Sequence, residues 1–95
     1  MSVNNIFTKN LPSLDLHGET RDTARVLIND FIKENIKLKN DKFVIIHGIG
    51  TGVLKKETQN ILRNNKKVIE FGIDFMNEGS TIVRINVWHF IHDIV

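Results

Sequence analysis

Three residues of the sequence have side chains suited to acid–base chemistry: Asp15, His17 and His47. A histidine with the ordinary pKa of about 6.5 gives or takes a proton at neutral pH. A carboxylate orients an imidazole and stabilises its charged form, or acts as a base itself. Since Asp15 and His17 are two residues apart, they should project from the same face of a strand. The structural alternative is that each histidine bonds a loop and that the aspartate caps a helix.

The segment Gly48–Gly52 directly follows His47, and every second residue in it is glycine. Glycine permits a positive φ and close backbone approach, as loops that cradle phosphate require. The spacing fits neither the dinucleotide-binding pattern nor the Walker A pattern, because both need glycine at the position of Val53. On spacing alone, a tight turn after a buried strand explains the segment as well as a ligand loop does.

The pattern of apolar residues predicts the elements that must position these groups, in the order strand, helix, strand, helix, strand, strand. The predicted strands are SLDLHG, FVIIHG, VIEFGI and STIVRINV, at residues 13–18, 43–48, 68–73 and 80–87. Residues 77–79 are predicted as the turn between the last two. One predicted helix runs to about Asn35 after an N-cap at Thr20 or Asp22, and the other opens after Gly52. Their apolar faces hold Ala24, Leu27, Ile28, Phe31 and Ile32, and Leu54, Thr58, Ile61 and Leu62.

The chain order brings the two histidines together. A strand–helix–strand unit of this spacing makes a right-handed crossover between parallel strands. If those strands are neighbours, their carboxyl ends share one edge of the sheet, where open α/β sheets bind ligands. Both helices also begin there, with unpaired N–H groups and partial positive charge. We therefore expect His17, His47 and the Asp15 carboxylate to converge, with the two helix N-termini, on one space that suits an anion, phosphate above all.

The composition narrows the class of protein. The 95 residues are enough for one domain, and 41% hydrophobic with 25% charged residues is ordinary for a globular chain. The net charge of +2 permits an anionic partner. The absence of cysteine excludes disulfides and thiolate metal sites. Residues 1–13 lack the plan of a signal peptide and no segment could span a membrane, so we expect a cytoplasmic protein without membrane contact. They are expected to be a flexible lead-in to one domain at residues 14–95.

Two outer groups of residues remain. Basic side chains near the predicted helix starts could follow a nucleic-acid backbone: Arg21, Arg25, Lys55 and Lys56. A second basic group is interpreted as a solvated face: Lys33, Lys37, Lys39 and Lys42. Trp88 and Phe90 would share one face if the last strand continued. They are expected to cover the sheet or to join a neighbouring copy in an oligomer, with base stacking as the alternative.

Three segments in order resemble the small MutS-related, or Smr, domain family. The sequence LDLHGETRDTARVLINDFI (14–32) resembles its opening motif, IIHGIGTGVLK (45–55) its second motif, and GSTIVRI (79–85) its closing strand. The similarity runs from about Leu14 to Val87, and the chain resembles a short, stand-alone form. It implies a two-layer α/β fold, with two helices on one face of a mixed four-stranded sheet, like the C-terminal domain of the third bacterial translation initiation factor.

The resemblance also implies nucleic-acid cleavage by an endonuclease. Smr domains nick DNA or cleave RNA, some of them on mRNA at stalled ribosomes, so RNA, DNA and the ribosome are the expected partners. The family residues tied to activity map onto Asp15, His17 and His47. No metal ligand or cofactor is assigned, and a requirement for Mg²⁺ is left open. The expected phosphate- or nucleic-acid-binding residues are Gly48, Gly50, Thr51, Gly52, Lys55, Lys56 and Arg21.

One departure from the family pattern keeps other functions open. The second motif usually has a basic residue between its first two glycines, and this chain has Ile49. A non-catalytic module that binds nucleic acid or ribosomes is therefore the alternative to an endonuclease. A site for a small phosphorylated ligand is a third interpretation. A shallow basic groove would favour a polynucleotide, and a closed pocket a metabolite.

Overall fold

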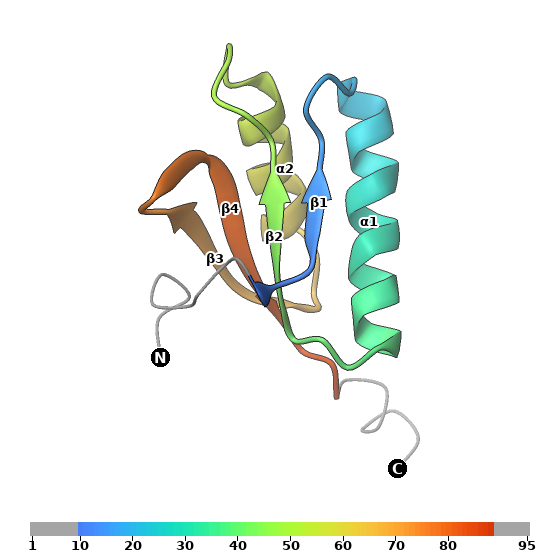
Figure 1. Cartoon of the computed structure of the whole chain (residues 1–95). Helices are drawn as coiled ribbons and strands as arrows, with labels where there is room; N and C mark the ends of the chain where they lie inside the picture. Colours follow the sequence, from blue (N-terminus) through green and yellow to red (C-terminus); the bar gives the residue numbers. More distant parts are fainter. Residues whose placement is uncertain (1–9, 89–95) are drawn as a thin grey trace.

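The computed structural model describes residues 10–88, which form a two-layer α/β fold. Figure 1 shows the two helices beside the sheet. The predicted order of elements is confirmed. It is β1 (Ser13–Asp15), α1 (Arg21–Lys37), β2 (Lys42–Ile46), α2 (Val53–Arg63), β3 (Val68–Asp74) and β4 (Asn77–Ile85).

The sheet has four strands in the order β1-β2-β4-β3. Strands β1 and β2 are parallel neighbours, with Leu14 opposite Ile45, and β4 is antiparallel to both β2 and β3. The predicted mixed sheet and the predicted pairing of the first two strands are therefore confirmed. The carboxyl ends of β1 and β2 lie at one edge, where the loops to α1 and α2 begin (Figure 1).

The main core lies between the helices and one face of the sheet. Side-chain alternation sends Phe43 and Ile45 of β2 to this face, while Val44 points to the other face and packs with Ile82 and Leu11. Strand β2 is thus buried on both faces, as its continuous apolar run predicts. The helices and β4 complete the main core with Ala24, Ile28, Ile32, Ile61, Leu62, Val83 and Ile85.

Local hydrogen bonds define both ends of α1. The Thr20 hydroxyl is the N-cap and accepts the Thr23 N–H at 3.1 Å, as predicted for this residue type. Asn35, although polar, is buried near the other end. Its amide donates to the Phe31 carbonyl and accepts from the Asn40 side chain, so its polar atoms are satisfied.

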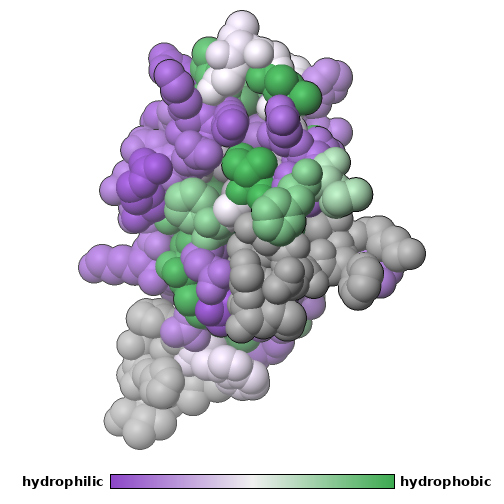
Figure 2. Space-filling view, turned by 90° about the vertical axis from the view of Figure 1, so that its left-hand side faces the viewer, coloured by the Kyte–Doolittle hydropathy of each residue, from purple (hydrophilic) through white to green (hydrophobic). Residues whose placement is uncertain are grey.

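The turn predicted at residues 77–79 is wrong. Those residues belong to β4, and the chain turns at Phe75 and Met76. The Asp74 carboxylate accepts the Met76 N–H at 2.9 Å and so stabilises the turn. Aspartate often stabilises a turn in this way, by a bond to the backbone N–H two residues later in the chain. The sequence did not indicate this turn, because the two residues at its tip, Phe75 and Met76, are apolar although exposed. Figure 2 shows apolar side chains on the side of the molecule that carries this hairpin.

The chain joins the sheet before the predicted domain start. The Pro12 carbonyl accepts the Val44 N–H at 2.9 Å, and Leu11 packs on the outer face. Trp88 is exposed beside the Lys39 ammonium, 4.9 Å from the ring centroid. Phe90, with the rest of the predicted apolar tail, lies outside the described residues. Within residues 10–88, no helix is both long and apolar enough to cross a membrane.

Candidate functional site

An open cavity of about 590 Å³ lies at the carboxyl ends of β1 and β2. Two chain segments line it, residues 17–21 after β1 and residues 47–55 after β2. His17 and His47 share this space, as the parallel pairing of the strands predicts. The other predicted residues that line it are Arg21, Gly48, Gly50, Thr51, Gly52 and Lys55. Asp15 and Lys56 do not line it.

His17 lines the cavity two residues after the end of β1. The strand stops at Asp15, whose carboxylate accepts the backbone N–H of His17 at 2.8 Å. The expectation that the two side chains share a strand face stays a prediction, since β1 ends at Asp15 and His17 lies beyond it. Asp15, opposite Ile46 in the register, is on the sheet face away from the main core. Within the described part of the chain, the His17 ring has no hydrogen-bond partner, so it is available to a ligand.

His47 is buried, at 4% exposure, and both of its ring nitrogens are engaged. Nδ1 lies 2.9 Å from the Gly48 carbonyl oxygen, which can only accept, so Nδ1 carries the proton. Nε2 then accepts the hydroxyl proton of Thr81, also at 2.9 Å. Burial lowers the pKa of His47, the bond to Gly48 opposes this, and the charge of Lys55 adds to the lowering. His47 is thus a neutral imidazole that joins the loop to β4.

Backbone bonds fasten the same loop to β4. The His47 and Gly48 N–H groups both donate to the Gly79 carbonyl, each at 2.9 Å. A Cβ at Gly79 would stand 3.2 Å from the Cα of Gly48, so this close approach favours glycine. The sequence analysis did not identify Thr81 or Gly79 as residues of the site. They could have been found from the antiparallel pairing of β2 with β4, which places Gly79 and Thr81 beside the end of β2.

The N-terminus of α2 opens into the cavity without a side-chain cap. Its N-cap is Gly52, at φ 83°, and the first helical bond joins the Lys56 N–H to the Gly52 carbonyl at 3.0 Å. The N–H groups of residues 53–55 therefore have no carbonyl within the helix to which they could donate a hydrogen bond. All three residues line the cavity. These donors, the helix dipole and Lys55 all favour an anion.

The remaining residues that line the cavity add charged and apolar groups to the site. Arg21 adds a second cation, and Glu19, which the sequence analysis did not identify, adds a carboxylate. Ile49 is 65% exposed at the rim, in the position where the family usually has a basic residue. Among the described residues, no group of three or more histidines and carboxylates could hold a metal ion. The cavity is built for an anion, with one free imidazole beside it.

Comparisons with known proteins agree with this geometry. The Smr domain family matches residues 14–86. The chain is 35% identical over 68 residues to Endonuclease MutS2 of Streptococcus suis, and 37% identical over 78 residues to that of Caldanaerobacter subterraneus. These alignments cover 72% and 82% of this chain but only 9% and 10% of the relatives. The chain therefore spans about a tenth of the length of these relatives.

Two solved structures share the fold. The Smr domain of Thermus thermophilus MutS2 has a TM-score of 0.77 and 27% identity, with 79% of this chain and 98% of that one covered. YdaL, a stand-alone small MutS-related protein from Escherichia coli, has a TM-score of 0.73 and 18% identity, with 77% and 63% covered. The predicted fold and family are both confirmed.

Replacement of His47 tests whether its neutral ring stabilises the site. Because burial lowers its pKa below 6.5, the unfolded state takes up a proton first as the pH falls. The contribution of His47 is thus present above pH 6.5 and lost at lower pH. Urea denaturation of His47→Gln and the wild type should give a difference in unfolding free energy that shrinks from pH 7.5 to pH 5. Asn35→Ala, a buried polar control that does not titrate, should keep a constant difference. A constant difference for His47→Gln would contradict the neutral ring.

Proposed function

The chain belongs to the Smr domain family, and from this we propose that it is a nucleic-acid endonuclease that cleaves phosphodiester bonds in the cavity between the β1–α1 and β2–α2 loops. One observation carries the proposal: His17, whose ring has no hydrogen-bond partner among the described residues, and the uncapped N-terminus of α2 line the same open cavity. The relatives named endonuclease support it. We propose RNA as the substrate, with ribosome-bound mRNA as one form, and the nicking of DNA as the alternative reaction.

The roles of the residues follow from the contacts. A phosphate in the cavity would accept hydrogen bonds from the N–H groups of residues 53–55, with Lys55 and Arg21 balancing its charge. In RNA, His17 would take the proton of the 2′-hydroxyl as that oxygen attacks phosphorus. The bond to the 5′-oxygen breaks, and that oxygen takes a proton from water. The products are a 2′,3′-cyclic phosphate and a 5′-hydroxyl.

His47 and Asp15 have supporting roles in this proposal. His47 has no free nitrogen and a lowered pKa, so we assign it the positioning of the glycine loop rather than proton transfer. Asp15 holds the backbone of His17 at the end of β1. Both residues would act on the rate through the groups that they hold in place.

The shape of the cavity favours a polynucleotide over a small phosphorylated ligand. The segment that contributes His17 and Arg21 is exposed along its whole length, and Ile49 and Val53 are exposed on the other side. A metabolite site usually surrounds most of its ligand, whereas an open surface lets a strand pass through. The exposed Ile49 also favours the second candidate, a module that binds nucleic acid without cleaving it.

The cleavage assay uses purified protein with labelled RNA, single-stranded DNA and supercoiled plasmid, each with and without EDTA. We expect cleavage of RNA that EDTA does not stop. His17→Ala should lower the rate by roughly 100- to 10,000-fold, the usual contribution of a positioned acid or base, with RNA affinity nearly unchanged. A 5′-phosphate product and loss of activity in EDTA would indicate metal-activated water instead. Binding without cleavage by the wild type would establish the binding module.

Ile49→Lys tests whether the glycine loop faces the nucleic-acid backbone. The added cation should tighten RNA binding and steepen its salt dependence by about 0.7, the contribution of one phosphate contact to a single strand. Met76→Lys is the matched control, because it adds the same charge at the 91% exposed hairpin tip, outside the cavity. Equal effects of the two substitutions would mean that the charge acts only through the net charge of the protein.

A further inference from the structure

A line of depressions leads from the cavity along the helices to the opposite end of the molecule. A second depression, of about 280 Å³, lies between α1 and α2 and is lined by Arg25, Asn29 and Asn60, among others. A third, of about 470 Å³, lies where α1 ends and is lined by Lys33, Lys37 and Lys67, among others. The three spaces therefore follow one another along the two helices.

The residues that α1 contributes make this line continuous. Arg21 lines the cavity, Arg25 and Asn29 the middle depression, and Lys33 and Lys37 the far one. Each residue is four positions after the last, so all five form a slowly winding stripe on the helix. On the other side, Lys55 of α2, then Asn60, and finally Lys67 beyond the end of α2 occupy the same three spaces. We call this line the interhelical groove.

The charges along the groove are strongly one-sided. With Lys39, seven of the thirteen Lys and Arg residues line the three spaces, whereas Glu19 is the one carboxylate among the described residues that do so. The acidic residues of α1, which are Asp22, Asp30 and Glu34, line none of them. The net charge of only +2 therefore hides a basic track, to which Lys33, Lys37 and Lys39 belong, whereas Lys42 of the group interpreted as a solvated face lies outside it.

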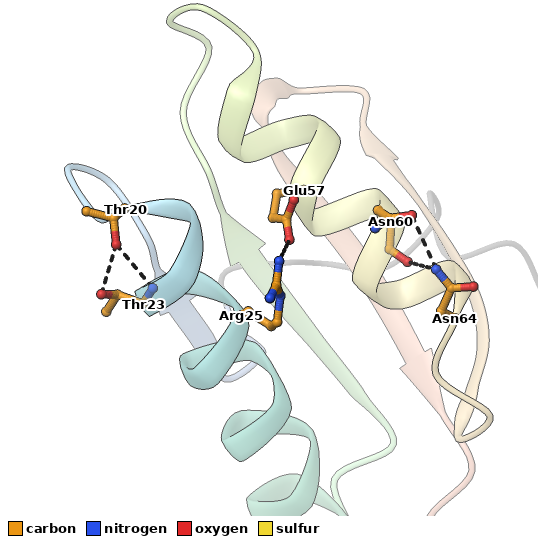
Figure 3. Close-up of polar contacts among 6 residues, drawn as sticks. All are labelled: Thr20, Thr23, Arg25, Glu57, Asn60 and Asn64. Carbon is orange, nitrogen blue, oxygen red and sulfur yellow. Dashed lines mark hydrogen bonds and ion pairs between the residues drawn. The ribbon is translucent and has the colours of Figure 1, made fainter.

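The middle of the groove keeps its hydrogen-bonding capacity. Figure 3 shows Arg25 of α1 and Glu57 of α2 pointing toward each other, with Asn60 and Asn64 farther along α2. The Arg25–Glu57 pair is 3.0 Å apart, yet the Arg25 side chain remains 57% exposed. A guanidinium has five N–H donors, so Arg25 can hold Glu57 and still bind an anion. The Asn64 amide N–H groups donate to the Asn60 carbonyl and to its Oδ1, which leaves Nδ2 of Asn60 as a donor and Oδ1 of Asn64 as an acceptor for a ligand.

We propose that the interhelical groove binds the single polynucleotide strand that enters or leaves the cavity. The inference rests on the proposed function, because a phosphodiester in the cavity requires flanking nucleotides to continue along the surface. The 17 residues of α1 span about 25 Å, which gives room for several nucleotides of an extended single strand. Lysine and arginine contact the phosphates, and the central asparagines contact bases or ribose.

The groove fits a polynucleotide better than an acidic segment of another protein. Its cations are spread along the whole length of α1, as a backbone with regular charge requires, and they begin at the cavity itself. The amides in the middle match base edges and hydroxyls, which both donate and accept, whereas a run of carboxylates only accepts.

The test measures binding of labelled 2′-O-methyl oligouridylates, which the proposed reaction cannot cleave, at lengths of two to twelve nucleotides and several salt concentrations. The wild type should bind more tightly as the oligonucleotide grows longer, and the affinity should level off once the groove is filled. Lys33→Gln/Lys37→Gln/Lys67→Gln should lose this gain beyond the shortest oligonucleotides, with a salt slope lower by about 2, or 0.7 per lost contact.

Single substitutions provide the matched comparison. Lys37→Gln should reduce the slope by about 0.7. Lys42→Gln removes the same charge from the sheet face away from the helices and should leave binding unchanged.

Circular dichroism confirms that each variant is folded. If short oligonucleotides bind but the triple variant keeps the wild-type length dependence, the proposal that the groove binds the strand is wrong, whereas the proposal that the cavity binds phosphate is retained. If none binds, both proposals fail. Tighter binding of polyglutamate than of oligouridylate would assign the groove to an acidic protein.

Discussion

The site depends on the anchoring of the β2–α2 loop to β4. Two N–H groups, from His47 and Gly48, share the Gly79 carbonyl, and the His47 ring bridges the Gly48 carbonyl and the Thr81 hydroxyl. These bonds fix the path of the chain where β2 ends, so they also fix the start of α2. The uncapped amides of α2 point at a defined space because the residues before them cannot move freely. The burial that lowers the pKa of His47 is a consequence of this anchoring.

The two histidines at the carboxyl ends of β1 and β2 have different roles. Parallel pairing of β1 and β2 brings both to one cavity, yet they differ in environment. His17 follows a strand of three residues at the edge of the sheet and is exposed. His47 follows a central strand that is buried on both faces, so its ring enters the interior and must find partners there. One histidine is therefore free for chemistry, and the other supports the loop.

Much of this arrangement is predictable from the sequence, and there are physical reasons why the remaining features are not. Periodicity gives the helices and β2, and crossover handedness gives the parallel pair and thus the shared cavity. Asp15 was expected at the shared space but does not line the cavity, because strand alternation places its side chain on the sheet face away from the main core. Thr81 and Gly79 were missed because antiparallel register between β2 and β4 places them beside His47. The four-residue repeat along α1 can be read in the sequence, but the residues of α2 and Lys67 that complete the interhelical groove are brought beside it by helix packing, which no local pattern reveals.

The central claim is that the cavity, through the amides that begin α2 and the ring of His17, holds a phosphate of a polynucleotide. Its most direct test is an NMR titration of the labelled protein with a short 2′-O-methyl oligouridylate, in which backbone amides and histidine rings are observed separately. The account predicts that the largest shifts occur at residues 48–55 and at the His17 ring, with the β3–β4 hairpin unaffected. Shifts confined to the hairpin, or to the sheet face away from the helices, would contradict it.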